Sequence, residues 1–110
     1  MTRLPENLKM IRLIRGYSLR QIAQMIDRSP GTISNWEHGK VSPDADALFK
    51  MCEIYKITPN ELLGWEPSKE IEAFKAERAD ALKELAKLKA QKSDIDQRIK
   101  AYTELLSHVE

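Results

Sequence analysis

Residues 16–40 read GYSLRQIAQMIDRSPGTISNWEHGK, and this stretch decides how the chain folds. Ser18 can cap the N-terminus of a helix, and Gln21 three residues later supplies the reciprocal side chain of a capping box. Ser29 followed by Pro30 is typical of a second helix start, with Ser as the N-cap and Pro as the first helical residue. The stretch therefore predicts two short helices in close succession.

The connection between these two helices is very short. Only Asp27 and Arg28 lie between Ile26, the last apolar residue of the first helix, and the cap Ser29. Helices joined so tightly cross at a steep angle, which leaves the second helix prominent on the surface. Asp27 stands where the chain must turn, and Asp tolerates the left-handed conformation that turns use. An ordinary helical hairpin in a small bundle has the same spacing.

Helix signals continue on both sides of this pair. Apolar residues recur at helical spacing over residues 7–15, which predicts a helix there. Asp44 and the Thr58-Pro59 pair are typical starts of a fourth and a fifth helix. After Ser68, 42 residues pass without Gly or Pro, and Ala, Lys, Glu and Leu dominate. We therefore expect an all-α chain of five short helices followed by one long helix.

Many positions between Leu8 and Gly64 agree at once with one known pattern. They are Gly16-Tyr17-Ser18, Gln21-Ile22-Ala23, Ser29, Thr32-Ile33-Ser34, Trp36-Glu37, Gly39-Lys40, Pro43 and Asn60-Glu61-Leu62-Leu63-Gly64. In these residues the chain resembles the Cro/C1 (XRE) helix-turn-helix family over about half its length. The resemblance implies a five-helix, lambda-repressor-like DNA-binding domain over residues 1–66, with the helix-turn-helix at about 19–38. The composition after that boundary separately predicts a helical tail over 67–110.

The resemblance also indicates which residues contact DNA. It places base-reading positions on four residues of the helix that enters the major groove: Pro30, Gly31, Thr32 and Asn35. Asn35 can bond an adenine edge with both the oxygen and the nitrogen of its side-chain amide, and Thr32 can exchange a hydrogen bond or contact a thymine methyl group. Contacts to phosphates, which set affinity without reading sequence, are expected from five residues: Arg20, Arg28, Ser29, Lys40 and Ser42.

Two residues depart from the family pattern. Leu19 stands where the family often has a Gln that bonds a phosphate, so Arg20 would have to replace that contact. Asp27 replaces the usual turn Gly and adds a negative charge near the expected DNA surface.

The resemblance also implies an ion pair between Arg12 and Glu37, joining the first helix to the end of the third. Two solvated charges, worth roughly 0–1 kcal/mol, are the alternative. Trp36 and Tyr55 are expected in the core, and Cys52 is expected to pack as a small hydrophobic side chain.

Composition narrows the class of protein. The 110 residues carry a formal charge of +1, but residues 1–43 hold seven basic and three acidic side chains. This asymmetry suits a face that meets a polyanion, although a mixed solvated surface has the same balance. One Cys and two His provide neither an internal disulfide nor a zinc site, so no metal and no cofactor are expected.

The expected setting is the cytoplasm. No apolar run approaches the roughly 18 residues that a membrane span requires, so no membrane contact is expected. Residues 1–6 lack the apolar stretch of a signal peptide, which favours a cytoplasmic, nucleoid-associated protein.

The tail carries a continuous heptad register from Ile71. Ten of its twelve a and d positions are apolar or small. A helix of 42 residues would be roughly 60 Å long and would leave an apolar seam bare without a partner. We expect a homodimeric coiled coil through ten residues: Ile71, Phe74, Ala81, Leu85, Leu88, Ile95, Ile99, Tyr102, Leu106 and Val109.

The arrangement of the tail stays open at this level. Parallel pairing sets Glu70 against Lys75 and Glu84 against Lys89, and holds both DNA-binding domains at one end. Antiparallel pairing centred near Ala90 separates the domains and keeps Arg78 and Lys92 away from their own copies. Its opposite charges are Lys75 with Glu110, Lys89 with Asp96, and Glu77 with Arg98. A hairpin that breaks near Ser93 is a third arrangement.

These features together favour a homodimeric, sequence-specific transcriptional regulator from a bacterium or phage. Repression by occupying an inverted-repeat operator on double-stranded DNA is the expected mode. The rival is a protein-interaction module, an antirepressor or adaptor of the same fold whose tail binds another protein. We expect no enzyme, because the chain lacks a Ser/His/Asp set and a glycine-rich phosphate loop, and no small-molecule ligand is evident.

Overall fold

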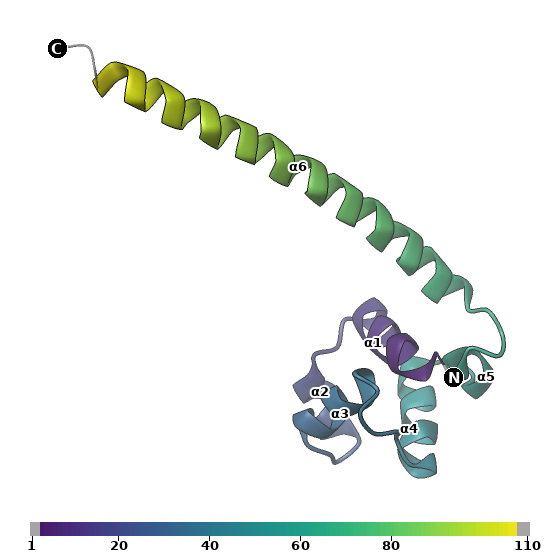
Figure 1. Cartoon of the computed structure of the whole chain (residues 1–110). Helices are drawn as coiled ribbons and strands as arrows, with labels where there is room; N and C mark the ends of the chain where they lie inside the picture. Colours follow the sequence, from purple (N-terminus) through teal and green to yellow (C-terminus); the bar gives the residue numbers. More distant parts are fainter. Residues whose placement is uncertain (1–2, 108–110) are drawn as a thin grey trace. The chain divides into compact units, whose positions relative to one another are not determined.

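The computed structural model describes residues 3–107, which form six helices and no strand (Figure 1). The helices are α1 (Leu4–Arg15), α2 (Leu19–Met25), α3 (Pro30–Glu37), α4 (Ala45–Tyr55), α5 (Pro59–Leu63) and α6 (Lys69–Ser107). This confirms the all-α prediction. Contacts divide the chain into two units, one ending at Lys75 and the other starting at Ala76. No helix in the described part is both long enough and apolar enough to cross a membrane.

The helix boundaries follow the capping residues. Ser18 and Gln21 form the predicted capping box, with Ser18 Oγ accepting from Gln21 N at 3.1 Å and Gln21 Oε1 accepting from Ser18 N at 2.8 Å. Thr58 and Glu61 form a second capping box at the start of α5, whereas Asp44 caps α4 by accepting from Ala47 N alone. The first helix begins at Leu4, earlier than the predicted residue 7, because Pro5 suits its first turn.

The turn between α2 and α3 is tight. Asp27 adopts φ 57°, a left-handed conformation that costs a residue with a Cβ more than Gly. The amide of Arg28 then donates to the Ala23 carbonyl at 2.8 Å, which closes the end of α2. The chain thus turns at the residue where the sequence predicts it.

The core of the first unit is apolar. Ile22, Ala23 and Ile26, at and just after α2, are all buried. Cys52 is buried too, and its burial raises the pKa of its thiol, so it packs as a neutral side chain. The largest fully buried side chains come from α1 to α5: Leu8, Ile11, Ile22, Ile33, Met51, Tyr55 and Leu62.

One ion pair crosses this core. Arg12 Nε and Nη2 donate to the two carboxylate oxygens of Glu37 at 2.7 and 2.9 Å, and the side chains are only 9% and 4% exposed. A third bond runs from Arg12 Nη1 to the Tyr17 carbonyl at 2.9 Å. The hydrogen bonds to Glu37 raise the pKa of Arg12, which keeps its guanidinium charged. The pair that the resemblance implies is therefore buried and bidentate, and it ties the end of α3 to α1.

The start of α6 belongs to the first unit. Ser68 Oγ accepts from Ile71 N at 3.3 Å, and Ile71 is only 2% exposed in the core, with Phe74 packed against it. Arg15 binds both carboxylate oxygens of Glu70, and Lys75 Nζ lies 3.8 Å from Glu6 Oε1. Ile71 and Phe74, which the heptad pattern assigns to a dimer seam, therefore pack within their own chain. The compact unit accordingly reaches Lys75 rather than ending at residue 66.

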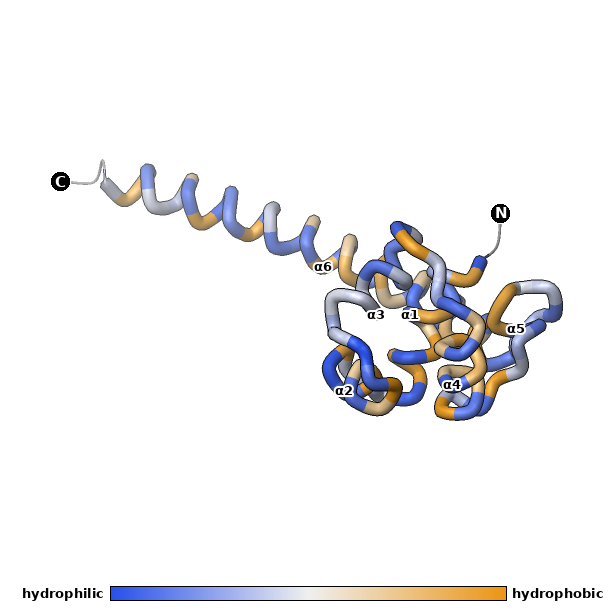
Figure 2. The backbone as a smooth tube through the Cα atoms, turned by 90° about the horizontal axis from the view of Figure 1, so that it is seen from below, coloured by the Kyte–Doolittle hydropathy of each residue, from blue (hydrophilic) through white to orange (hydrophobic). Residues whose placement is uncertain are grey.

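The second unit is a single exposed helical segment. α6 runs through Ser93 without a break, so no hairpin forms within residues 69–107. Hydrophobic bands recur along the helix between hydrophilic ones (Figure 2). The large apolar side chains of this second unit are exposed: Leu82, Leu85, Leu88, Ile95, Ile99, Tyr102, Leu105 and Leu106. The predicted interface residue Val109 lies outside the described residues.

Replacing Glu37 tests the buried pair. Glu37→Ala would leave the Arg12 guanidinium buried without its carboxylate, and we expect the free energy of unfolding to fall by about 3–5 kcal/mol in urea titrations. As a control, the double variant Arg12→Met with Glu37→Leu removes both charges and should recover most of that loss. A loss below about 1 kcal/mol for Glu37→Ala would mean that the pair behaves as a solvated one.

Candidate nucleic-acid interface

Helix α3 has one buried and one exposed face. Ile33 and Trp36 are 1% and 3% exposed and anchor the helix, which packs on α1 and α2. The predicted reading positions lie on the other face, where Pro30, Gly31 and Asn35 are exposed and Thr32 is half-buried. The core thus holds α3 rigidly while its outer face remains open to a partner.

Part of the hydrogen-bonding capacity at the start of α3 is already used. Ser29 Oγ accepts from Thr32 N at 3.2 Å and lies 2.8 Å from Thr32 Oγ1. A hydroxyl has one donor and two acceptor sites, so each of these side chains keeps some capacity for an external partner. The pair therefore fixes the Thr32 side chain and holds its hydroxyl at the exposed start of the helix.

Gly31 has no structural requirement to be Gly. Its φ is not positive, and a Cβ placed there would approach only Ser29 Oγ, at 3.9 Å. Gly in a helix costs up to about 1 kcal/mol relative to Ala. The fold thus gains nothing from Gly31, whereas the missing side chain lets the backbone approach a partner closely.

Asn35 presents its side chain to solvent near the end of α3. The backbone carbonyl oxygen of Asn35 accepts from the backbone amide of Lys40 at 3.0 Å, so the chain after α3 folds back against the last turn. Lys40 and Ser42 in this loop are exposed, and so is Arg20 on α2. Three of the predicted phosphate contacts therefore lie on α2 and on the loop that follows α3.

Arg28 is the predicted phosphate contact with the most internal partners. Its Nη2 donates to Asp44 Oδ2 at 2.7 Å, and its guanidinium carbon lies 5.7 Å from the centre of the Trp36 ring. Asp44 also accepts from the amide of Ala47, and the hydrogen bonds from Ala47 and Arg28 lower the pKa of its carboxyl group. Arg28 is thus held in place by an anion of its own chain.

This pair is the part of the surface that sequence reasoning missed. The sequence identifies Asp44 only as a helix cap, whereas the structure gives its second oxygen to a residue 16 positions away. A tertiary contact of this kind leaves no local signal in the sequence. Leu19 is half-buried and packs against the core, so the position where the family often has Gln serves packing here.

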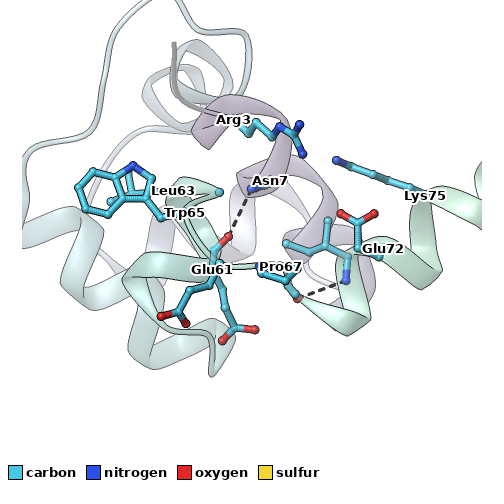
Figure 3. Close-up of a pocket in the computed structure, with 12 residues that line it drawn as sticks. Arg3, Asn7, Glu61, Leu63, Trp65, Pro67, Glu72 and Lys75 are labelled. Carbon is cyan, nitrogen blue, oxygen red and sulfur yellow. Dashed lines mark hydrogen bonds between the residues drawn. The ribbon is translucent and has the colours of Figure 1, made fainter.

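A separate hollow of about 460 Å³ lies where α5 leads into α6 (Figure 3). Arg3 and Lys75 line it together with Glu61, Glu66 and Glu72, so its charges are mixed. Glu61 Oε1 already accepts from the hydroxyl of Thr58 at 3.0 Å. The hollow presents no single charge to a ligand, and α3 remains the candidate site.

Comparison with known proteins agrees with this geometry. A helix-turn-helix family model matches residues 8–62, half of the chain and all of α2 to α4. The HTH-type transcriptional regulator ImmR of Bacillus subtilis (strain 168) is 31% identical over 61 residues, which cover 56% of this chain. The chain spans about half the length of this curated relative, since the match covers 48% of it. No solved structure matches. The chain belongs to the helix-turn-helix family, in its Cro/C1 (XRE) branch.

Proposed function

We propose that this protein binds double-stranded DNA as a homodimer, with α3 in the major groove, and represses transcription at the nucleoid by occupying an operator. The observation that carries the proposal is the outer face of α3, which is open while Ile33 and Trp36 anchor the helix in the core. An α-helix with its side chains is about 10–12 Å across, and the major groove of B-form DNA is about 12 Å wide. Membership of the family and similarity to a transcriptional regulator support the same function.

Base recognition falls to the outer face of α3. Asn35 is exposed and can bond an adenine edge with both the oxygen and the nitrogen of its side-chain amide. Thr32 can give its remaining hydrogen bond or its methyl group to a base. Pro30 and Gly31 offer little side-chain readout, and we assign them to close approach of the backbone and to contacts through water.

Phosphate contacts set affinity and register around this face. Arg20, Lys40 and Ser42 are exposed and can reach the backbone directly. Ser29 offers its hydroxyl at the start of α3. Arg28 can bind a phosphate once it releases Asp44. Binding should therefore weaken steeply with salt, whereas a slope of log K against log salt near −1 would contradict multiple phosphate contacts and favour a protein-interaction module.

The helical tail joins the two copies of the homodimer. The exposed apolar side chains of α6 form the seam, from Ala81 to Leu106 within the described residues. Two copies related by a two-fold axis read two half-sites of opposite direction, so the operator is an inverted repeat. Selection of bound sites from random duplexes tests the proposal, and a pool without any repeated motif would overturn it.

Asn35→Ala should separate base reading from general binding. We expect it to cost about 1–3 kcal/mol on the selected site, with relaxed base preference at one position per half-site. Fluorescence anisotropy on selected and random duplexes measures both. Lys40→Ala is the matched control, because losing a phosphate contact should weaken binding to all duplexes and make the salt slope shallower by about 1. Equal losses on both duplexes for Asn35→Ala would refute its role.

Gly31→Ala should move stability and binding in opposite directions. The methyl group meets no clash within the chain, so the free energy of unfolding should rise by about 0.5–1 kcal/mol. The same methyl group would stand between α3 and the floor of the groove, so affinity for the selected site should fall about tenfold or more, a loss of about 1.4 kcal/mol. Unchanged affinity in the stabilised variant would show that the backbone does not approach DNA there.

A further inference from the structure

The exposed seam of α6 allows two arrangements of a second copy, and the charges beside it differ between them. Within the free segment from Ala76 onward, every described side chain is exposed, including Leu85, Leu88, Ile95 and Ile99 of the seam. The orientation of two chains has meaning only where the proposed homodimer forms, so this inference rests on that proposal. In coiled coils the flanking charged positions set partner orientation, and these charges therefore distinguish the two arrangements.

The structure weakens the parallel arrangement at its N-terminal end. Parallel pairing relies on two attractive contacts, Glu70 with Lys75 and Glu84 with Lys89 of the other copy. Glu70 is already bound by Arg15, and Lys75 lies 3.8 Å from Glu6 of its own chain. Only the contact between Glu84 and Lys89 is left in the free segment.

Parallel pairing also places like charges in the seam. Arg78 and Lys92 occupy a positions of the heptad, so each would face its own copy across the dimer axis. Like charges held opposite each other in an apolar seam repel and lose hydration. The like charges at Arg78 and at Lys92 therefore oppose parallel pairing. Only the attractive contact between Glu84 and Lys89 is available to offset them.

Antiparallel pairing removes both difficulties. Centred on Ala90, it sets Leu85 against Ile95 of the second copy, and Arg78 and Lys92 against Tyr102 and Leu88. The flanking positions then bring opposite charges together: Lys89 meets Asp96, and Glu77 meets Arg98, each twice by symmetry. All four side chains are exposed in the single chain, and the Arg98 side chain, 70% exposed, bonds Asp94 at 3.1 Å on its own helix surface.

We propose that two copies of α6 pair antiparallel, in the register centred on Ala90. Lys75 of one copy then lies opposite Leu105 of the other. The two Lys75 residues, at which the DNA-binding units end, are therefore 30 residues apart along the coiled coil, or roughly 45 Å at 1.5 Å per residue. The two DNA-binding units leave the coiled coil at opposite ends. Parallel pairing would instead hold both units at the same end of the coiled coil.

Disulfide capture in the full-length chain tests the orientation. In a Cys52→Ala background, chains carrying Leu85→Cys and chains carrying Ile95→Cys are mixed and oxidised in a glutathione buffer. The antiparallel register predicts a mixed disulfide between the two variants, identified by mass, and little cross-linking of either variant alone. Cross-linking of each variant to itself, without the mixed species, would mean parallel pairing and overturn the proposal.

Charge reversal gives an independent readout by sedimentation equilibrium. Lys89→Glu should weaken the dimer about tenfold, because two attractive contacts become repulsive. Adding Asp96→Lys should restore it. The matched control, Glu84→Lys added to Lys89→Glu, should fail to restore it, since Glu84 faces Gln91 in this register. Restoration of the dimer by Glu84→Lys and not by Asp96→Lys, each added to Lys89→Glu, would overturn the antiparallel proposal. A chain that is monomeric at every concentration would overturn the homodimer itself.

Discussion

The bidentate contact between Arg12 and Glu37 is the constraint on which the exposed outer face of α3 depends. It joins the first helix to the last residue of α3 through the core, where Ile33 and Trp36 already hold the same helix. A buried pair demands close geometry, because each charge is costly without the other. The orientation of α3 is thus fixed from inside, and its outer residues require no contacts from the rest of the chain.

The eight residues of α3 are divided between a face that packs in the core and a face that is exposed. The inward side chains of α3 are apolar or paired, while Pro30, Gly31 and Asn35 on the outer face are exposed. Substitutions on the outer face can therefore change the chemistry of that face without changing the core. The capping residue Ser29 contributes to both faces, because it caps the start of the helix and also bonds the Thr32 hydroxyl.

Local rules predicted most of the fold. The caps at Ser18, Ser29 and Asp44 and the left-handed turn at Asp27 are decided by the residues themselves, and the structure has each of them. The heptad pattern was less informative at its N-terminal end. An apolar residue at a helical interval looks the same whether it meets its own domain or a second chain, so only the tertiary structure shows that Ile71 packs inward. The pairing of Arg28 with Asp44 was missed for the same reason.

The partner that Arg28 already has bears on how this protein would search a genome. Asp44 is tethered a few ångströms away, so its carboxylate competes with any incoming phosphate at a high effective concentration. In the proposed complex with DNA, a loosely placed phosphate would lose that competition, and a phosphate held in register by the neighbouring contacts would win it. In that complex the internal carboxylate would shorten the dwell time on random duplex, so that the protein would leave wrong sites sooner than the correct one.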